Sequence, residues 1–198
     1  MRFHAEQRFT SPADRLLTLF TDADFYPTLR GLPSIGAPEI VDHSTSGDTV
    51  RISLRQRYTG DIPAAALAFI DPGRLTWVEE LVFDLDRRRA TTRLLPDHYP
   101  DRLSCQGVYV FADVAGGGST RRLEGELKVR APLVGGRVEQ ALVSGLQEHA
   151  AAEQRLVEER LATPAGGPSA KKPSAKKPSA KKGSSEKSSS GKKKSSKA

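Results

Sequence analysis

The chain of 198 residues has a net charge of +7, but that charge is divided unevenly along its length. Residues 163–198 contain eleven lysines and one acid, which leaves residues 1–162 with a net charge of −3. One cysteine excludes an internal disulfide framework, and no run of ~18 apolar residues is present to span a membrane. We therefore expect a cytoplasmic domain of residues 1–162, large enough to bury a full core, followed by a basic tail of residues 163–198.

The first forty residues predict one strand and two short helices. Residues 2–9 alternate between apolar and polar side chains, although Gln7 interrupts the apolar side. Ser11 as N-cap and Pro12 at the first helical position then indicate the start of a helix. A second short helix is expected over residues 22–29, because a Gly-Leu-Pro turn follows it.

Six further strands are predicted, and their alternating hydrophobicity is typical of an antiparallel sheet with one wet face. Arginines at positions 51, 55 and 57 mark the solvent side of one of these strands. A glycine triplet at 116–118 predicts the last hairpin turn, and residues 62–69 predict a short helical turn. The expected strands are residues 35–43, 49–58, 75–83, 87–95, 102–114 and 119–130.

A long amphipathic helix is expected over residues 132–161, beginning near two consecutive glycines. Its predicted apolar face carries small and medium side chains, which can lie close to a sheet or leave space beside one. We assign Glu139, Glu148 and Glu153 to the solvent side of this helix. The predicted apolar face consists of Val138, Leu142, Gly145, Leu146, His149, Ala152 and Leu156.

This order of elements, together with the phrases MRFHAEQRF, FTDADFYPTL, DPGRLTWVEE and APLVGGRVE, resembles the START, polyketide-cyclase and birch-pollen-allergen (SRPBCC, helix-grip) superfamily. More narrowly, the chain resembles an actinobacterial family known as a domain of unknown function. The resemblance covers about residues 1–161 and implies an α+β fold of order β-α-α-β-β-β-β-β-β-α. It implies a curved, seven-stranded antiparallel sheet wrapped around a long C-terminal helix. It also implies a hydrophobic cavity, but no particular ligand, because the fold hosts several functions.

The first functional hypothesis is non-catalytic binding of a small hydrophobic or lipid-like ligand in that cavity, with no cofactor. Aromatic side chains on strands and apolar side chains on the helix line ligand pockets, but they also form ordinary cores. The candidate ligand-binding residues are Tyr58, Trp77, Phe83, Tyr109, Phe111, Leu142, Leu146 and His149.

A second hypothesis is a cyclase-like or hydrolase-like enzyme that uses the same cavity. His149 falls on the apolar face of the long helix, and one of the adjacent residues Glu79 and Glu80 must point inward. We consider His149 or Glu80 as the proton-transfer group, because a dry pocket gives an ionisable residue a useful pKa. No motif for a metal, phosphate or nucleophile is present, so we assign no catalytic residue and no metal ligand.

The tail favours a third hypothesis, a nucleic-acid-associated protein located at the nucleoid by residues 163–198. Residues 168–182 are three copies of PSAKK, and so few apolar residues predict disorder. The tail resembles those of linker histones and would attract DNA, RNA or an anionic lipid surface without sequence preference. A solubilising tail with no partner is the alternative. The candidate polyanion-binding residues are Lys171, Lys172, Lys176, Lys177, Lys181, Lys182, Lys192, Lys193 and Lys194.

Overall fold

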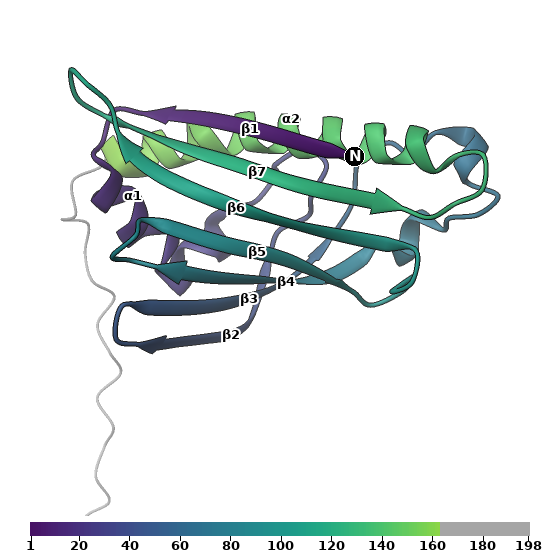
Figure 1. Cartoon of the computed structure of the whole chain (residues 1–198), viewed down its shortest axis with the longest axis horizontal. Coiled ribbons are helices and arrows are strands. Elements are labelled where there is room, and N and C mark those ends of the chain that lie inside the picture. The colour runs from purple at the N-terminus through teal and green to yellow at the C-terminus, as the bar shows by residue number, and fades with distance from the viewer. Residues whose placement is uncertain (163–198) are drawn as a thin grey trace, which may run out of the picture. The chain divides into compact units, whose positions relative to one another are not determined.

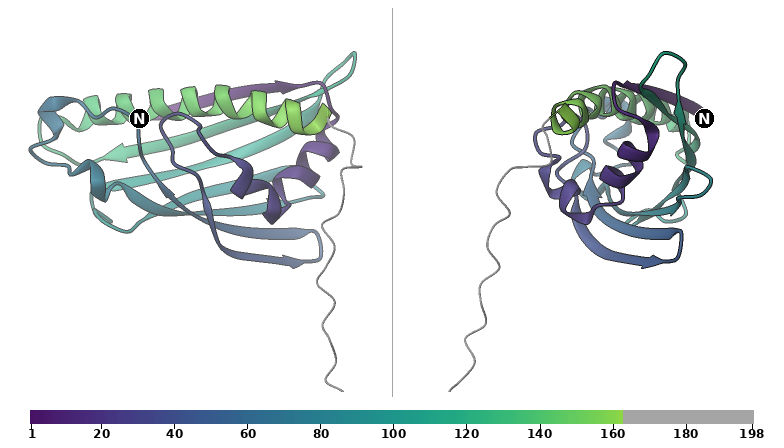
Figure 2. Two further views of the ribbon diagram at one scale, coloured as in Figure 1. Left: turned by 180° about the vertical axis from the view of Figure 1, so that it is seen from behind. Right: turned by 90° about the vertical axis from the view of Figure 1, so that its left-hand side faces the viewer.

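The structure is a computed structural model that describes residues 1–162, so the predicted tail and its lysines lie outside the described residues. Seven antiparallel strands form one sheet in the order β1-β7-β6-β5-β4-β3-β2. Figure 1 shows this sheet as a curved layer with the long helix α2 running along it. From the end, the sheet bends around one side of α2, with α1 and η1 across the opening of the curve (Figure 2). The predicted α+β helix-grip fold is confirmed.

The order of elements matches the prediction, and the bounds differ by a few residues. The strands are β1 (Arg2–Phe9), β2 (Glu39–Ser46), β3 (Thr49–Arg57), β4 (Thr76–Asp84), β5 (Arg89–Pro96), β6 (Leu103–Asp113) and β7 (Ser119–Val129). The helices are α1 (Ala13–Phe20) and α2 (Gly135–Ala162), and the 3₁₀ turns are η1 (Ala23–Thr28), η2 (Ala64–Ala66) and η3 (Pro72–Arg74).

The second strand was predicted four residues too early. Ile35 forms an isolated bridge with Tyr58, and the ladder of β2 begins at Glu39. Pro38 lies between them and has no N–H to donate to a ladder, which explains the late start. The strand then continues to Ser46, because Gly47 takes a positive φ of 55° and allows a tighter turn than expected.

The start of α1 also differs from the prediction by one residue. Ser11 was expected as the N-cap, but the helix begins at Ala13 and Pro12 occupies the cap position. The backbone N–H of Ala13 donates to a carboxylate oxygen of Asp113 on β6, at 2.8 Å. The sheet therefore satisfies one of the free N–H groups at the start of α1.

The core consists of two buried clusters on the inner face of the sheet. One gathers α1, η1 and the C-terminal half of α2 around residues such as Phe20 and Val157. The other gathers the N-terminal half of α2 around residues such as Trp77 and Val138. Cys105 belongs to this second cluster, and burial raises the pKa of its thiol to about 12.

The helix α2 packs closely where its side chains are small. A Cβ at Gly145 would lie 2.7 Å from the hydroxyl oxygen of Tyr58, so a larger residue there would force the Tyr58 side chain or the helix to shift. The Tyr58 hydroxyl donates to the carbonyl oxygen of Ala141 at 3.3 Å. Although α2 is long, neither it nor any other helix within residues 1–162 is apolar enough over a sufficient length to cross a membrane.

Candidate functional site

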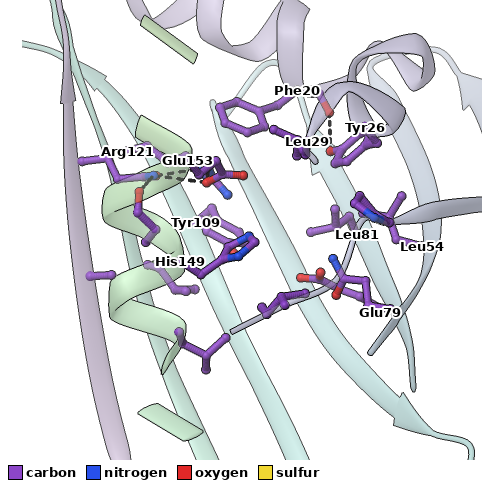
Figure 3. A pocket seen from close by; sticks show the side chains of 18 of the residues that line it. Phe20, Tyr26, Leu29, Leu54, Glu79, Leu81, Tyr109, Arg121, His149 and Glu153 are labelled. Atoms are coloured by element: carbon purple, nitrogen blue, oxygen red, sulfur yellow. Dashed lines mark hydrogen bonds and ion pairs between the residues drawn. The ribbon is translucent and has the colours of Figure 1, made fainter. Parts of the chain in front are cut away.

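A cavity of about 100 Å³ lies between the inner face of the sheet and α2. Strands β1, β3, β4, β5, β6 and β7 contribute to its wall, together with α1, η1 and the segment that precedes β2. Most of the lining side chains are aromatic or aliphatic. Figure 3 shows polar residues among them, with Arg121 and Glu153 bonded to each other and His149 and Glu79 pointing into the space.

Six of the eight predicted ligand-binding residues line this cavity: Trp77, Phe83, Tyr109, Phe111, Leu146 and His149. The other two, Tyr58 and Leu142, do not line it. Tyr58 packs beneath Gly145, and Leu142 faces a separate space of about 20 Å³ beside the N-terminal half of α2. Both are buried in the cluster around the N-terminal half of α2. A ligand-binding role for the other six remains a prediction.

One wall of the cavity holds a buried ion pair that the sequence analysis missed. Arg121 Nη1 lies 2.6 Å from Glu153 Oε2, and the two side chains are 9% and 10% exposed. Gln7 Nε2 donates to Glu153 Oε2 at 3.1 Å and to the carbonyl oxygen of Ala150 at 2.6 Å. Gln7 Oε1 in turn accepts from Arg121 Nη1 at 3.1 Å. The prediction that Glu153 faces solvent was wrong, because the ion pair with Arg121 and the hydrogen bond from Gln7 hold its carboxylate inside the protein.

The guanidinium of Arg121 is held between two aromatic rings. Its Cζ lies 4.0 Å from the ring centre of Phe20 and 4.3 Å from that of Tyr109, and such rings attract a cation to their faces. Burial disfavours the charged form of Arg121, but Glu153 overcomes this and holds the pKa of Arg121 above its ordinary value. Burial also raises the pKa of Glu153, but Arg121, followed by His149, holds it below its ordinary value. Both side chains are therefore ionised, and their opposite charges cancel.

Glu79 is the inward carboxyl of β4, and Glu80 points the other way. Glu80 lies on the outer face, where Glu80 Oε2 is 3.4 Å from Arg93 Nη2, so the hypothesis that it acts inside the cavity was wrong. Glu79 Oε1 accepts a hydrogen bond of 2.6 Å from the Thr92 hydroxyl. The Glu79 side chain is partly exposed, and it lines the cavity. Burial raises the pKa of Glu79 above its ordinary value.

His149 reaches the cavity from α2, as predicted. Its Nδ1 lies 3.0 Å from the carbonyl oxygen of Pro33, so a proton on Nδ1 donates to that oxygen and leaves Nε2 for another partner. This contact joins α2 to the segment before β2. Glu79 and His149 thus place a carboxyl group and an imidazole in the wall of one cavity. Within residues 1–162, no three His, Cys, Asp or Glu side chains are grouped as a metal site.

The environment of Glu79 predicts a stability effect with a defined pH dependence. Because its folded pKa is raised, ionisation destabilises the fold above that pKa, and the penalty disappears below the unfolded value of ~4.3. Glu79→Gln is therefore expected to raise the free energy of unfolding at pH 7.5 but not at pH 4, as measured by urea denaturation. Glu80→Gln, on the outer face, should show no such difference. A Glu79→Gln variant that is less stable than the wild type at pH 7.5 contradicts this account.

The model of a family of proteins of unknown function, DUF2505, matches residues 4–161. The chain belongs to this family. The match includes all or most of every strand and helix described above and agrees with the predicted resemblance to a domain of unknown function. No curated protein matches the sequence of this DUF2505 protein.

Solved structures with similar folds include two enzymes. The ZhuI aromatase/cyclase from Streptomyces sp. R1128 has a TM-score of 0.59 and 17% identity, over 84% of this chain and 98% of that chain. Norcoclaurine synthase from Thalictrum flavum, in complex with dopamine and hydroxybenzaldehyde, has a TM-score of 0.55 and 17% identity, over 80% and 87%. The protein TTHA0849 from Thermus thermophilus has a TM-score of 0.58 and 19% identity, over 84% and 100%. At these identities the likeness shows the fold of the DUF2505 protein alone.

Proposed function

We propose that this DUF2505 protein binds a small, largely apolar molecule between its sheet and α2, without acting on it chemically. The observation that carries the proposal is a cavity with a mostly apolar wall, in which Gln7 bonds to both members of the buried pair Arg121–Glu153. Apolar burial supplies the affinity in such a site, while a few polar groups fix orientation.

The size of the cavity limits the size of the ligand. An engineered protein cavity of ~150 Å³ accepts benzene, whereas drug-sized ligands occupy roughly 300–1,000 Å³. A volume of about 100 Å³ therefore favours a molecule of about one ring, admitted by small side-chain movements, over a lipid with long acyl chains. The complex of norcoclaurine synthase with dopamine and hydroxybenzaldehyde supports this proposal, because both are one-ring molecules in a related fold.

Two measurements on the full-length protein test the proposal. Native mass spectrometry, followed by denaturing extraction, is expected to show a small apolar adduct that is lost on unfolding. If the purified protein is empty, ¹⁹F NMR should show saturable binding of 4-fluorotoluene at one site. The absence of both the adduct and saturable binding would overturn the proposal.

We also propose that residues 163–198 attach the protein to polyanions, with DNA as the expected partner. The supporting observation is charge, since eleven lysines and one acid follow a domain with a net charge of −3. Removal of residues 163–198 is expected to abolish retardation of DNA at low salt, equally for unrelated sequences. In the intact chain, affinity should fall with salt at a log–log slope of about −0.9 per neutralised phosphate. Unchanged retardation by the shortened chain contradicts the proposal.

A further inference from the structure

The charges that face the cavity do not balance. Arg121 and Glu153 neutralise each other, which leaves Glu79 as the remaining carboxyl. Within residues 1–162, Glu79 accepts one hydrogen bond, from Thr92, and it forms no ion pair. Among the described residues no hydrogen bond or ion pair joins Glu79 to His149, whose Nδ1 is engaged by the carbonyl oxygen of Pro33. The cavity therefore carries one carboxylate with no counter-ion in contact whenever Glu79 is ionised.

The surroundings of Glu79 make that charge costly. Along β4 its inward neighbours are Trp77 and Leu81, and its register partners on β3 and β5 are Leu54 and Leu94. A carboxylate among such side chains either takes up a proton or acquires a counter-ion. The raised pKa of Glu79 agrees with a cavity that lacks the counter-ion. The ionisable groups that interact electrostatically with Glu79 are Arg121, Glu153 and His149, together with Tyr26, Tyr109 and Cys105.

We infer that the ligand itself supplies the counter-ion, so that the DUF2505 cavity binds a one-ring molecule carrying a protonated amine, with its nitrogen at the Glu79 carboxylate. This inference rests on the proposed function and names the chemical class of the ligand. The aromatic side chains of Trp77 and Tyr109 line the same space, and ring faces attract organic cations as well as covering an apolar ring. An ammonium group would also donate to the carboxylate oxygen that Thr92 leaves open.

The other ligand charges fit the cavity poorly. An anionic ligand would meet Glu79 and would need Arg121 as its partner. Arg121 Nη1 is already bonded to Glu153 and Gln7, and two aromatic rings pack against the guanidinium. Its buried Nε has no hydrogen-bond partner among residues 1–162, so that single N–H would have to hold the anion. A neutral ligand would leave the carboxylate of Glu79 without a counter-ion. A cationic ligand removes the imbalance with no rearrangement of the existing network.

Calorimetric titration of the full-length protein at pH 7.5 tests this inference with three probes of similar size: benzylamine, benzyl alcohol and benzoate. We expect benzylamine to bind at least tenfold more tightly than benzyl alcohol, and benzoate to bind weakest. Glu79→Gln should remove the preference for the amine while still binding 4-fluorotoluene, which shows that the cavity is intact. Glu80→Gln, one residue along the same strand but on the outer face, should keep the wild-type preference.

The outcomes separate this inference from the proposed function. Equal affinity for benzylamine and benzyl alcohol, or an amine preference that survives in Glu79→Gln, overturns the inference. Saturable binding of 4-fluorotoluene without any preference for the amine overturns the inference alone and leaves the cavity as an apolar site. Failure of 4-fluorotoluene and of all three probes to bind overturns both.

Discussion

Replacement of Arg121 by methionine is expected to lower the free energy of unfolding by about 3–5 kcal/mol, which is the usual cost of breaking a buried ion pair. The substitution leaves the Glu153 carboxylate 10% exposed, with only Gln7 still donating to it through a side chain among the described residues. Methionine retains much of the packing against Phe20 and Tyr109, so the loss reports the removed charge. Urea denaturation at pH 7.5 measures the effect.

The adjacent arginine supplies the control for this experiment. Arg122 points outward and pairs with Glu6 at 2.8 Å on an exposed surface, where such pairs contribute about 0–1 kcal/mol. Arg122→Met should therefore change stability little, and the double variant Arg121→Met/Glu153→Leu should recover most of the loss, because it removes both charges together. A single Arg121→Met variant as stable as Arg122→Met would show that the buried pair does not stabilise the fold.

The pH dependence of the same pair has the opposite sign from that of Glu79. The folded pKa of Glu153 is lowered, so its stabilising contribution is complete above the unfolded value of ~4.3 and is lost as the pH falls through the folded value. For Glu79 the folded pKa is raised, and acid relieves a penalty. Two carboxylates on one cavity thus respond differently to acid, because one has a cationic partner and the other has none.

Most of the fold could be predicted because most of its strands alternate between apolar and polar residues and its long helix is amphipathic. The predicted apolar face of α2 was wrong beyond His149, where we expected it to continue through Ala152 and Leu156. The structure instead buries Glu153, Val157 and Leu161, which are equally consistent with helical spacing. Helical periodicity alone fits both series of residues. We assigned Glu153 to the solvent side because it is charged, and that assignment was wrong.

The buried ion pair nevertheless had a signal in the sequence. Gln7 interrupts the apolar side of β1, Arg121 lies in phase with Leu123 and Leu127 on β7, and Glu153 lies four residues after His149. Three polar residues that interrupt three apolar faces satisfy one another when those faces meet. The same parity argument identifies Glu79, in phase with Trp77, Leu81 and Phe83, as the inward carboxyl of β4.

The same patterns could not show which inward residues line the cavity and which pack in the core. Periodicity places Tyr58 and Leu142 on inward faces, and both are buried. Whether an inward residue meets the cavity or the packed core depends on how closely α2 approaches the sheet at that point. That approach is set by contacts such as Gly145 against Tyr58, between residues that are distant in sequence.

Ala150→Phe is expected to weaken binding of both 4-fluorotoluene and benzylamine on the order of a hundredfold or more. The Ala150 side chain lines the cavity from α2, and a phenyl ring built there occupies much of a space of about 100 Å³. The backbone carbonyl that accepts from Gln7 is retained, so the polar network around Arg121 has no direct reason to change. The cost in stability should stay within the range of about 1–3 kcal/mol for an added group in a packed interior.

Ala151→Phe provides a matched control, because residue 151 is exposed on the same helix and carries the same added ring away from the cavity. Its affinities should equal those of the wild type. If Ala150→Phe binds the two probes as well as Ala151→Phe does, the ligand lies outside the space between the sheet and α2. If Ala150→Phe loses 4-fluorotoluene binding while Glu79→Gln loses only benzylamine binding, the two residues have different roles in the cavity wall. Residue 150 would then limit the volume of the ligand, and Glu79 would select its charge.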